Sequence, residues 1–459
     1  MTDTLMVGVS GVRGIVGKDL TDEIVGRYAR AFGLWAAGRK PLVVVGRDAR
    51  ESGPAFERAV VDGLRSVGCA VVKVGLVPTP TVQLAVEHHA AGGGIAITAS
   101  HNPIEWNALK FIGPDGIFLD GADGARVQKL VGEDGGGRGR TGEVTTDDGA
   151  VERHLDAVLR LAAVAVERIR KRKLTVALDA VRGAGGPVMR ALLERLGCEV
   201  AGINLETDGR FPRSPEPVPE NLGGLSTLVT RAGAALGIAV DPDVDRLAIV
   251  DENGTPIGED YTLAFAVRAV LGKGERGKGK GATVVCNLST SLVVEDAARE
   301  CGAEVVRTPV GEVHVARAIL RLAAVIGGEG NGGVMYPALH AGRDAPVAAA
   351  LLLTLLARDG RRMSELVAAA PRYAIVKAKV ERGAGSREQR LERVYAELRR
   401  RFPDARADTQ DGLRLAWWDR WLHVRPSNTE PIIRLIAEAP SGAVAQELVD
   451  EGRRVCAAS

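Results

Sequence analysis

Disulfide bonds and zinc sites find little support in this sequence. Its five cysteines are far apart, form no C-x-x-C pair and do not cluster with histidine; they are Cys69, Cys198, Cys286, Cys301 and Cys456. Secreted domains pair their cysteines and zinc sites group them, whereas cytosolic proteins keep isolated thiols reduced. The pattern predicts a cytoplasmic protein with reduced thiols in its core.

Aromatic residues, net charge and long apolar runs are also scarce. Aromatic residues make up 4% of the chain, and 60 basic residues against 58 acidic ones leave a formal net charge of +2. Nucleic-acid sites need stacking platforms or a basic surface. No window reaches the roughly 18 apolar residues of a spanning helix, and residues 1–11 do not resemble a signal peptide. We therefore expect no nucleic-acid or membrane partner.

What the sequence does contain is a regular alternation of short apolar runs and longer amphipathic ones. The first block reads strand, helix, strand, helix, strand over residues 41–46, 54–68, 70–75, 80–90 and 93–98. This alternation is typical of an α/β layer with buried, largely parallel strands. It returns in residues 174–241 and 282–330, so we predict three similar α/β units.

The chain after about residue 367 has a different pattern, with a helix over 386–402 and antiparallel strands around Arg425, which predicts an α+β unit. Since single domains usually span ~100–200 residues, we expect four domains. Their predicted bounds are 1–150, 151–252, 253–366 and 367–459. Two segments rich in glycine and charge, 132–142 and 272–281, are predicted to be connections.

The first of four polar turns is TASHNP, residues 98–103, which follows an apolar run. Ser100 at the end of a strand can face a cleft, but a serine needs an activating neighbour to act as a nucleophile. No G-x-S-x-G surrounds it, so a hydrolase elbow is not indicated. A structural turn or helix-capping serine remains the alternative at this point.

The second turn is DPDVDR, in which Asp241, Asp243 and Asp245 follow the apolar run 236–240. Three carboxylates at alternate positions can converge on one hard cation. A calcium-binding EF-hand is disfavoured because Arg246 stands where that loop needs glycine. The turn predicts a divalent metal site, most simply for Mg²⁺.

The third turn is the glycine-rich stretch 327–333. Read from Gly328 it fits G-x-G-x-x-G, but the acidic residue that a dinucleotide site needs about 20 residues later is missing. Glu329 and Asn331 on such a backbone suit hydrogen bonds to sugar hydroxyls better.

The fourth turn is RPSNTEP, residues 425–431, with a further arginine close behind it. Guanidinium groups, hydroxyls and backbone N–H groups in one turn match the geometry of a phosphate. The residues that would form this cradle are Arg425, Ser427, Asn428, Thr429 and Arg434. A plain exposed loop is the alternative when the stretch is considered alone.

Together the four turns indicate phosphoryl transfer on a sugar phosphate, and the chain resembles the phosphohexomutase superfamily. Members of that superfamily interconvert sugar 1-phosphates and 6-phosphates. The resemblance rests on TASHNP, DPDVDR and RPSNTEP and runs in the family's order from residue 8 to about residue 434. It implies three similar α/β domains and a smaller α+β C-terminal domain around a central cleft.

The resemblance also implies roles for individual residues. Ser100 would carry a phosphate and, with Asp241, Asp243 and Asp245, would hold one Mg²⁺ per chain. The catalytic centre would be lined by Arg13, His101, Lys110 and Arg246. Glu329 and Asn331 would contact sugar hydroxyls, and the fourth turn would bind the phosphate that is not reacting.

A phosphoenzyme route would pass through a sugar 1,6-bisphosphate, which would also serve as activator. We expect Lys110, with a pKa lowered by nearby cations, to move the proton, with His101 as the alternative. The predicted partner is a small hexose phosphate, and the protein is expected to be a monomer or a homodimer.

The sugar loop departs from the pattern of many members, because Asn331 and Gly333 replace serine and histidine. Glucosamine 6-phosphate is the first substrate prediction, which would make the chain a phosphoglucosamine mutase. A phosphomannomutase/phosphoglucomutase activity is the alternative. Two other classes are a metal-dependent sugar phosphatase, which usually needs more metal-binding histidines, and a non-catalytic sugar-phosphate sensor.

Overall fold

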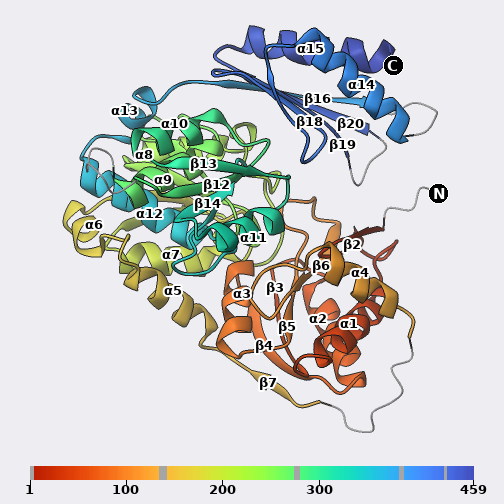
Figure 1. Ribbon diagram of the computed structural model, residues 1–459. Helices are drawn as coiled ribbons and strands as arrows, with labels where there is room; N and C mark the ends of the chain where they lie inside the picture. The colour runs from red at the N-terminus through yellow and green to blue at the C-terminus, as the bar shows by residue number, and fades with distance from the viewer. Residues whose placement is uncertain (1–4, 134–141, 273–279, 382–386, 428–431, 459) are drawn as a thin grey trace.

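Four β-sheets follow one another along the chain in the computed structural model, each with its own helices (Figure 1). The structure describes residues 5–133, 142–272, 280–381, 387–427 and 432–458. Most of the two predicted connections, 132–142 and 272–281, lie outside the described residues. We call the sheets and their helices domains I to IV. This division confirms the predicted architecture.

Domain I is built on a seven-stranded sheet of order β1-β2-β6-β5-β3-β4-β7. Its strands are β1 Met6–Gly8, β2 Gly11–Ile15, β3 Leu42–Arg47, β4 Ala70–Leu76, β5 Gly93–Ile97, β6 Trp106–Ile112 and β7 Val144–Thr146. Its helices are α1 Asp22–Ala37, α2 Gly53–Ser66, α3 Thr79–His88 and α4 Gly121–Leu130. Strand β3 pairs in parallel with β4 and β5, as predicted.

Strand β6 was not predicted, and it makes half of this sheet antiparallel. It pairs antiparallel with β5 and with β2. The turn that contains Ser100 joins β5 directly to β6, and a connection this short can only reverse the chain. Within domain I, the prediction of largely parallel strands therefore holds for β5, β3, β4 and β7.

Domains II and III repeat one sheet topology, with orders β11-β10-β8-β9 and β13-β12-β14-β15. Domain II has β8 Thr175–Asp179, β9 Glu199–Ile203, β10 Leu236–Val240, β11 Leu247–Asp251, α5 Ala150–Arg160, α6 Val166–Arg172, α7 Gly185–Arg195 and α8 Gly223–Ala232. Domain III has β12 Thr283–Asn287, β13 Glu304–Thr308, β14 Ile326–Glu329, β15 Gly333–Met335, α9 Asp260–Leu271, α10 Leu292–Glu300, α11 Glu312–Leu322, α12 Ala345–Asp359 and α13 Met363–Ala368.

Each of the first three domains places a polar turn at the same topological position. In each, one parallel strand is followed directly in the chain by an antiparallel partner, giving the pairs β5–β6, β10–β11 and β14–β15. The turns that close these hairpins are the serine turn, the aspartate turn and the glycine-rich turn. A repeated topology thus brings three different chemistries to equivalent places.

Domains II and III share a continuous apolar core. The sequence of α12 is almost entirely apolar, and its residues 345–356 are all buried. Such a helix is apolar on every side because it packs within the protein on every side. It contacts α5 and α6 of domain II and α9 of its own domain.

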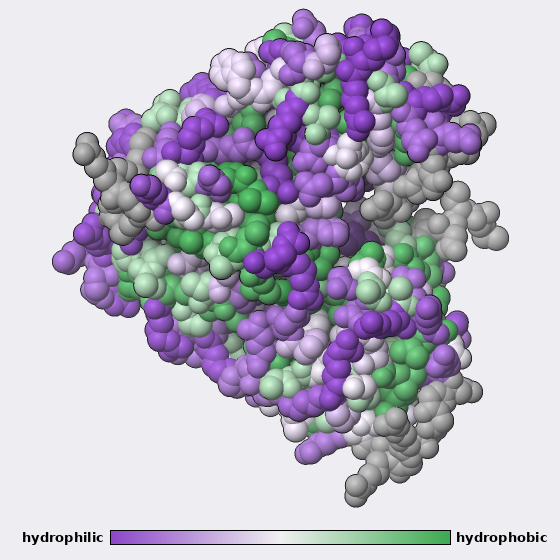
Figure 2. Space-filling view, in the orientation of Figure 1, coloured by the Kyte–Doolittle hydropathy of each residue, from purple (hydrophilic) through white to green (hydrophobic). Residues whose placement is uncertain are grey.

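Domain IV is a five-stranded antiparallel sheet of order β16-β20-β19-β18-β17 with helices packed on it. Its elements are β16 Ala374–Glu381, β17 Arg406–Asp408, β18 Leu413–Ala416, β19 Trp421–Pro426, β20 Ile432–Ala439, α14 Arg387–Arg401 and α15 Gly442–Ala458. Figure 1 shows it at the top of the molecule, with domain I at the lower right. Figure 2 shows a hollow between these two parts, where hydrophilic residues are visible.

The five cysteines are buried and none takes part in a disulfide bond, as predicted. Among the described residues, no helix is both long enough and apolar enough to cross a membrane.

A buried polar cluster joins the first three domains. The Oδ2 atom of Asp344 lies 2.8 Å from Nε2 of His154 and 2.9 Å from Nε2 of His340. His154 Nδ1 lies 2.9 Å from the Thr81 hydroxyl in domain I. His340 Nδ1 accepts from the N–H of Gly342, so its Nε2 carries the hydrogen and donates to Asp344. Burial acts to raise the pKa of Asp344, but the two histidines outweigh it and hold that pKa well below its usual range.

Asp344→Asn is expected to lower the melting temperature by roughly 5 °C or more. The carboxylate accepts from the histidines at one oxygen and from the Val347 N–H, at the start of α12, at the other. An asparagine must turn its NH₂ group toward one of these donors, which leaves an unmatched buried pair. Thermal unfolding followed by circular dichroism measures the shift. Asp148→Asn, at an exposed position, is the control, and equal melting temperatures for the two variants would contradict the prediction.

Candidate active site

The serine turn and the aspartate turn meet through direct side-chain contacts, and Arg343 links the aspartate turn to the glycine-rich turn. The Ser100 hydroxyl donates to Oδ2 of Asp241 at 2.7 Å. Lys110 on β6 donates to Oδ2 of Asp243 at 2.6 Å. Arg343 in domain III donates to Oδ2 of Asp245 at 2.6 Å. The predicted residues of the first two turns are therefore brought together.

The backbone at Ser100 is strained, and a series of hydrogen bonds holds it in place. Its φ is 47°, in the left-handed region, and its side chain is buried. Its N–H donates to the Thr98 hydroxyl at 2.9 Å, and that hydroxyl donates to Asp48 at 2.6 Å. Strain of this kind persists only where the surroundings determine the conformation. A structural capping role does not explain a hydroxyl aimed at a carboxylate of another domain.

Arg50 positions the backbone of the serine turn, a role that sequence reasoning missed. Its buried guanidinium is paired with Asp48 at 3.2 Å. It donates to the carbonyl oxygens of Ser100, Asn102 and Pro103, each at 2.7 Å, and of Trp106 at 2.9 Å. A planar five-donor group suits this task because its donors have fixed directions.

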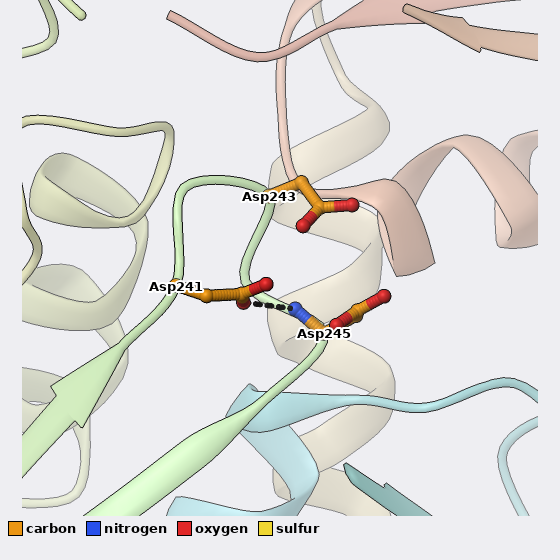
Figure 3. A group of neighbouring side chains, drawn as sticks. All are labelled: Asp241, Asp243 and Asp245. Atoms are coloured by element: carbon orange, nitrogen blue, oxygen red, sulfur yellow. Dashed lines mark hydrogen bonds between the residues drawn. The ribbon is translucent and has the colours of Figure 1, made fainter. Parts of the chain in front are cut away.

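The aspartate turn presents three converging carboxylates (Figure 3). Asp241 Oδ1 accepts from the N–H groups of Asp245 and Arg246, both at 3.1 Å. Val244 takes a left-handed φ of 62°, unusual for a β-branched residue, and this bends the turn. One ligand oxygen from each aspartate lies within 4.8 Å of the others. The chain then continues directly as β11, which excludes an EF-hand loop.

The donor set fits a small divalent cation. Oδ1 of Asp243 and Oδ1 of Asp245 are buried and accept no hydrogen bond from the described residues. Burial, Asp245 and Asp243 raise the pKa of Asp241 well above its usual range. Like charges enclosed in this way attract either a proton or a cation, and oxygen-only ligands suit Mg²⁺.

Positive groups also lie around the serine turn and the aspartate turn. Arg13 donates to Asn102 Oδ1 at 2.6 Å, and Arg246 is buried beside the aspartates. Burial, followed by the charge of Arg246, lowers the pKa of Arg13. Burial and the same cationic surroundings lower the pKa of His101 to about 2, so this imidazole is neutral. His101 Nδ1 lies 3.5 Å from the Ser100 hydroxyl. Such a cluster favours binding of a phosphate dianion.

Lys110 differs from the expectation of a lowered pKa. Burial does act to lower it, but Asp243 and Asp245 outweigh burial, and the pKa of Lys110 lies above its usual value. The cause is contact: its nearest partners are carboxylates at 2.6 and 3.4 Å.

The glycine-rich turn is part of an antiparallel hairpin, so it is not the strand-to-helix turn of a dinucleotide site. Glu329, at the end of β14, is buried and accepts from Asn287 at 2.9 Å and from Asn331 at 3.4 Å. Arg343 donates at 2.9 Å to Oε2 of Glu329, the oxygen that also accepts from Asn331, whereas Asn287 donates to Oε1. Glu329 and Asn331 are thus held together beside the aspartate turn.

The fourth turn is only partly described, because Asn428 and Thr429 lie outside the described residues. Arg425 on β19 and Arg434 on β20 are register partners, and Ser427 follows at the end of β19. Arg425 forms an ion pair at 3.1 Å with Asp411, whose carboxylate also accepts from the N–H of Val310 in domain III. Through Asp411, Arg425 is therefore tied to the neighbouring domain.

The fold and the site together define a phosphohexomutase. The phosphoglucomutase/phosphomannomutase family models match in chain order: α/β/α domain I over residues 4–138, domain II over 152–254, domain III over 258–373 and the C-terminal domain over 375–455. The chain belongs to this family.

Relatives and solved structures agree with this assignment. The chain is 40% identical to a phosphoglucomutase/phosphomannomutase of Thermococcus kodakarensis, with 97% of each chain covered. It is also 40% identical to a probable phosphoglucosamine mutase of Methanopyrus kandleri, covering 97% of this chain and 96% of that one. A family protein from Burkholderia thailandensis superposes with a TM-score of 0.83 at 28% identity, over 99% of this chain and 98% of its own.

Sequence reasoning overlooked Arg343 and Glu312 as well as Arg50. Arg343 lies one residue before the helix-capping Asp344, and Glu312 begins α11 and pairs with Arg343 at 3.0 Å. One available signal was charge balance, because several buried carboxylates require buried cations nearby.

Arg50→Lys is expected to reduce mutase kcat by about 100-fold, because a displacement of about 1 Å at a reacting group has that effect. Lysine keeps the charge but cannot donate to four separate carbonyl groups. Steady-state kinetics measure kcat, and intact-mass spectrometry measures the fraction of protein phosphorylated at Ser100. Arg58→Lys, on the exposed face of α2, is the control. A kcat within twofold of the wild type would refute this role for Arg50.

Proposed function

We propose that this phosphohexomutase works through a phosphate carried on Ser100. The observation that supports this most is the Ser100 hydroxyl 2.7 Å from Asp241, in a strained turn between a carboxylate cluster and buried cations. Anchored donors and charges of this kind stabilise a phosphoryl group in transfer.

The chemistry has two transfers. A free sugar hydroxyl forms a bond to phosphorus as the bond from phosphorus to Ser100 Oγ breaks, which produces a sugar 1,6-bisphosphate and an unphosphorylated serine. The hydroxyl proton passes to the serine oxygen through a nearby side chain. Lys110 is our candidate, and because its pKa is raised its amine would first give a proton to the serine oxygen and then take one from the sugar hydroxyl. Neutral His101 is the alternative. The bisphosphate then turns end for end, and Ser100 receives the other phosphate.

The remaining groups bind and orient the substrate. Asp241, Asp243 and Asp245, with an oxygen of the Ser100 phosphate, would hold one Mg²⁺, which supplies charge stabilisation when bound. Arg13 and Arg246 would hold the reacting phosphate, and Glu329 and Asn331 the sugar hydroxyls. Arg425, Ser427, Asn428, Thr429 and Arg434 would bind the distal phosphate. A sugar 1,6-bisphosphate would prime an unphosphorylated chain.

The preferred sugar in this proposal is glucosamine 6-phosphate. It is supported by the similarity to the Methanopyrus kandleri protein. The equally similar Thermococcus kodakarensis protein supports mannose and glucose phosphates as alternatives. The partner is a small hexose phosphate bound by a monomer or homodimer, and the isolated thiols fit a cytoplasmic location.

Phosphorus NMR on Mg²⁺-loaded protein, primed with a catalytic amount of glucose 1,6-bisphosphate, tests the substrate. Glucosamine, glucose and mannose 6-phosphates are supplied separately, and we expect the 1-phosphate resonance to grow fastest from glucosamine 6-phosphate. Faster conversion of mannose or glucose phosphate would favour the alternative sugars. Release of inorganic phosphate at the same rate would instead indicate a phosphatase.

Chelation of divalent cations is expected to abolish turnover, and added Mg²⁺ to restore it.

In Ser100→Ala the protein should take up no phosphate from glucose 1,6-bisphosphate and should show at least a 1,000-fold loss of activity, on the order expected when a nucleophile is removed. Intact-mass spectrometry follows the added phosphate. Ser289→Ala, in domain III near domain IV, is a control for phosphorylation. A phosphorylated Ser100→Ala protein would place the carrier elsewhere.

A further inference from the structure

Arg343 stands at the junction between the aspartate turn and the glycine-rich turn. One guanidinium nitrogen donates to Asp245 at 2.6 Å and lies 3.0 Å from Glu312, and the other donates to Glu329 at 2.9 Å. The arginine is 7% exposed. A single side chain therefore connects a carboxylate of domain II with two carboxylates of domain III.

The path of the Arg343 side chain depends on the absence of a side chain at residue 333. A Cβ atom at Gly333 would lie 2.3 Å from Cδ of Arg343 and 2.9 Å from its Cγ. Gly333 is the first residue of β15, where it pairs with Glu329, and its φ is not among the positive ones. Glycine is thus needed here for space and not for an unusual backbone conformation.

The arginine cannot easily move aside. Its backbone is paired to Met335 of β15, and its guanidinium is held by three carboxylates. Shifting Cγ and Cδ would pull the guanidinium away from these partners and leave buried charges uncompensated.

The contacts also orient the predicted ligand atoms. Arg343 and Lys110 both occupy Oδ2 of Asp245, at 2.6 and 3.4 Å. Oδ1 of the same carboxylate is thereby left without a hydrogen bond from the described residues and remains the atom available to the aspartate cluster. Partners that hold a metal ligand by its second oxygen set its direction.

We propose that Arg343 is a positioning residue that couples the metal turn to the sugar loop, and that Gly333 is its obligatory companion. Through Asp245 it aims a metal ligand, and through Glu329 it aims a sugar-binding carboxylate. The proposal rests on the mutase function above for its kinetic readouts and goes beyond it for metal binding.

A double-mutant cycle tests the pairing. Gly333→Ala alone is expected to raise the Mg²⁺ dissociation constant and the KM for sugar phosphate by about 10–100-fold each, the usual effect of losing a partner of a metal ligand. In an Arg343→Ala background, which already has both losses, the same Gly333→Ala substitution should change neither value by more than about twofold. Gly223→Ala, where a Cβ meets nothing within 4 Å, is the control for adding a methyl group.

Calorimetric titration of Mg²⁺ into the unphosphorylated protein gives a readout that needs no turnover, so it stands apart from the mutase proposal. The proposal would be overturned if the fold-changes caused by the two substitutions multiplied in the double variant. It would also be overturned if Arg343→Ala left the Mg²⁺ affinity unchanged. If Arg343→Ala does not fold, as judged by circular dichroism, Arg343→Lys replaces it. Lysine keeps the charge but lacks the two guanidinium nitrogens that contact Asp245 and Glu329, so the Mg²⁺ affinity should still fall. An unchanged affinity would equally overturn the proposal.

Discussion

The constraint on which this structure depends is the burial of carboxylates that repel one another. Asp241, Asp243, Asp245, Glu312 and Glu329 lie close together and are largely shielded from water. Isolated buried charges are very costly, so each must take up a proton or be matched by a cation. Arg246 comes from the same turn, but Lys110 comes from domain I and Arg343 from domain III. Charge compensation therefore requires that the first three domains be docked together.

This requirement links assembly to chemistry. The serine hydroxyl reaches Asp241 only because β5 and β6 of domain I face the aspartate turn of domain II. Two other contacts also join domain I to domain II. Thr79 donates to Asp243, and Arg50 lies over the ring of Phe211. The three aspartates and the serine are thus positioned relative to one another by interdomain contacts, and a loosened interface would separate them before any domain unfolded.

How far the sequence predicted this arrangement depends on whether a feature is local. The aspartate turn and the glycine-rich turn were predicted because their residues are neighbours in the chain and follow apolar strands. Strand β6 was missed because its residues 106–112 mix tryptophan, asparagine and lysine with apolar side chains, and no alternation marks them. Arg343 and Arg50 were not assigned roles because their function depends on partners up to 98 residues away for one and 56 for the other. No local pattern records such contacts.

The placement of domain IV follows a different logic from that of the other three. Among the described residues, no hydrogen bond or ion pair joins it to the aspartate turn, and hydrogen bonds join it to domain III. Ser289 meets His423, and Asp411 joins Arg425 to Val310. The buried carboxylate of Glu438 accepts from the Ser291 hydroxyl and from the Leu292 N–H at the start of α10. In each of these hydrogen bonds the group that domain III supplies is neutral, whereas the first three domains are joined by paired charges. The domain of the proposed phosphate cradle is therefore docked through neutral groups of domain III, separately from the charge cluster that joins the first three domains.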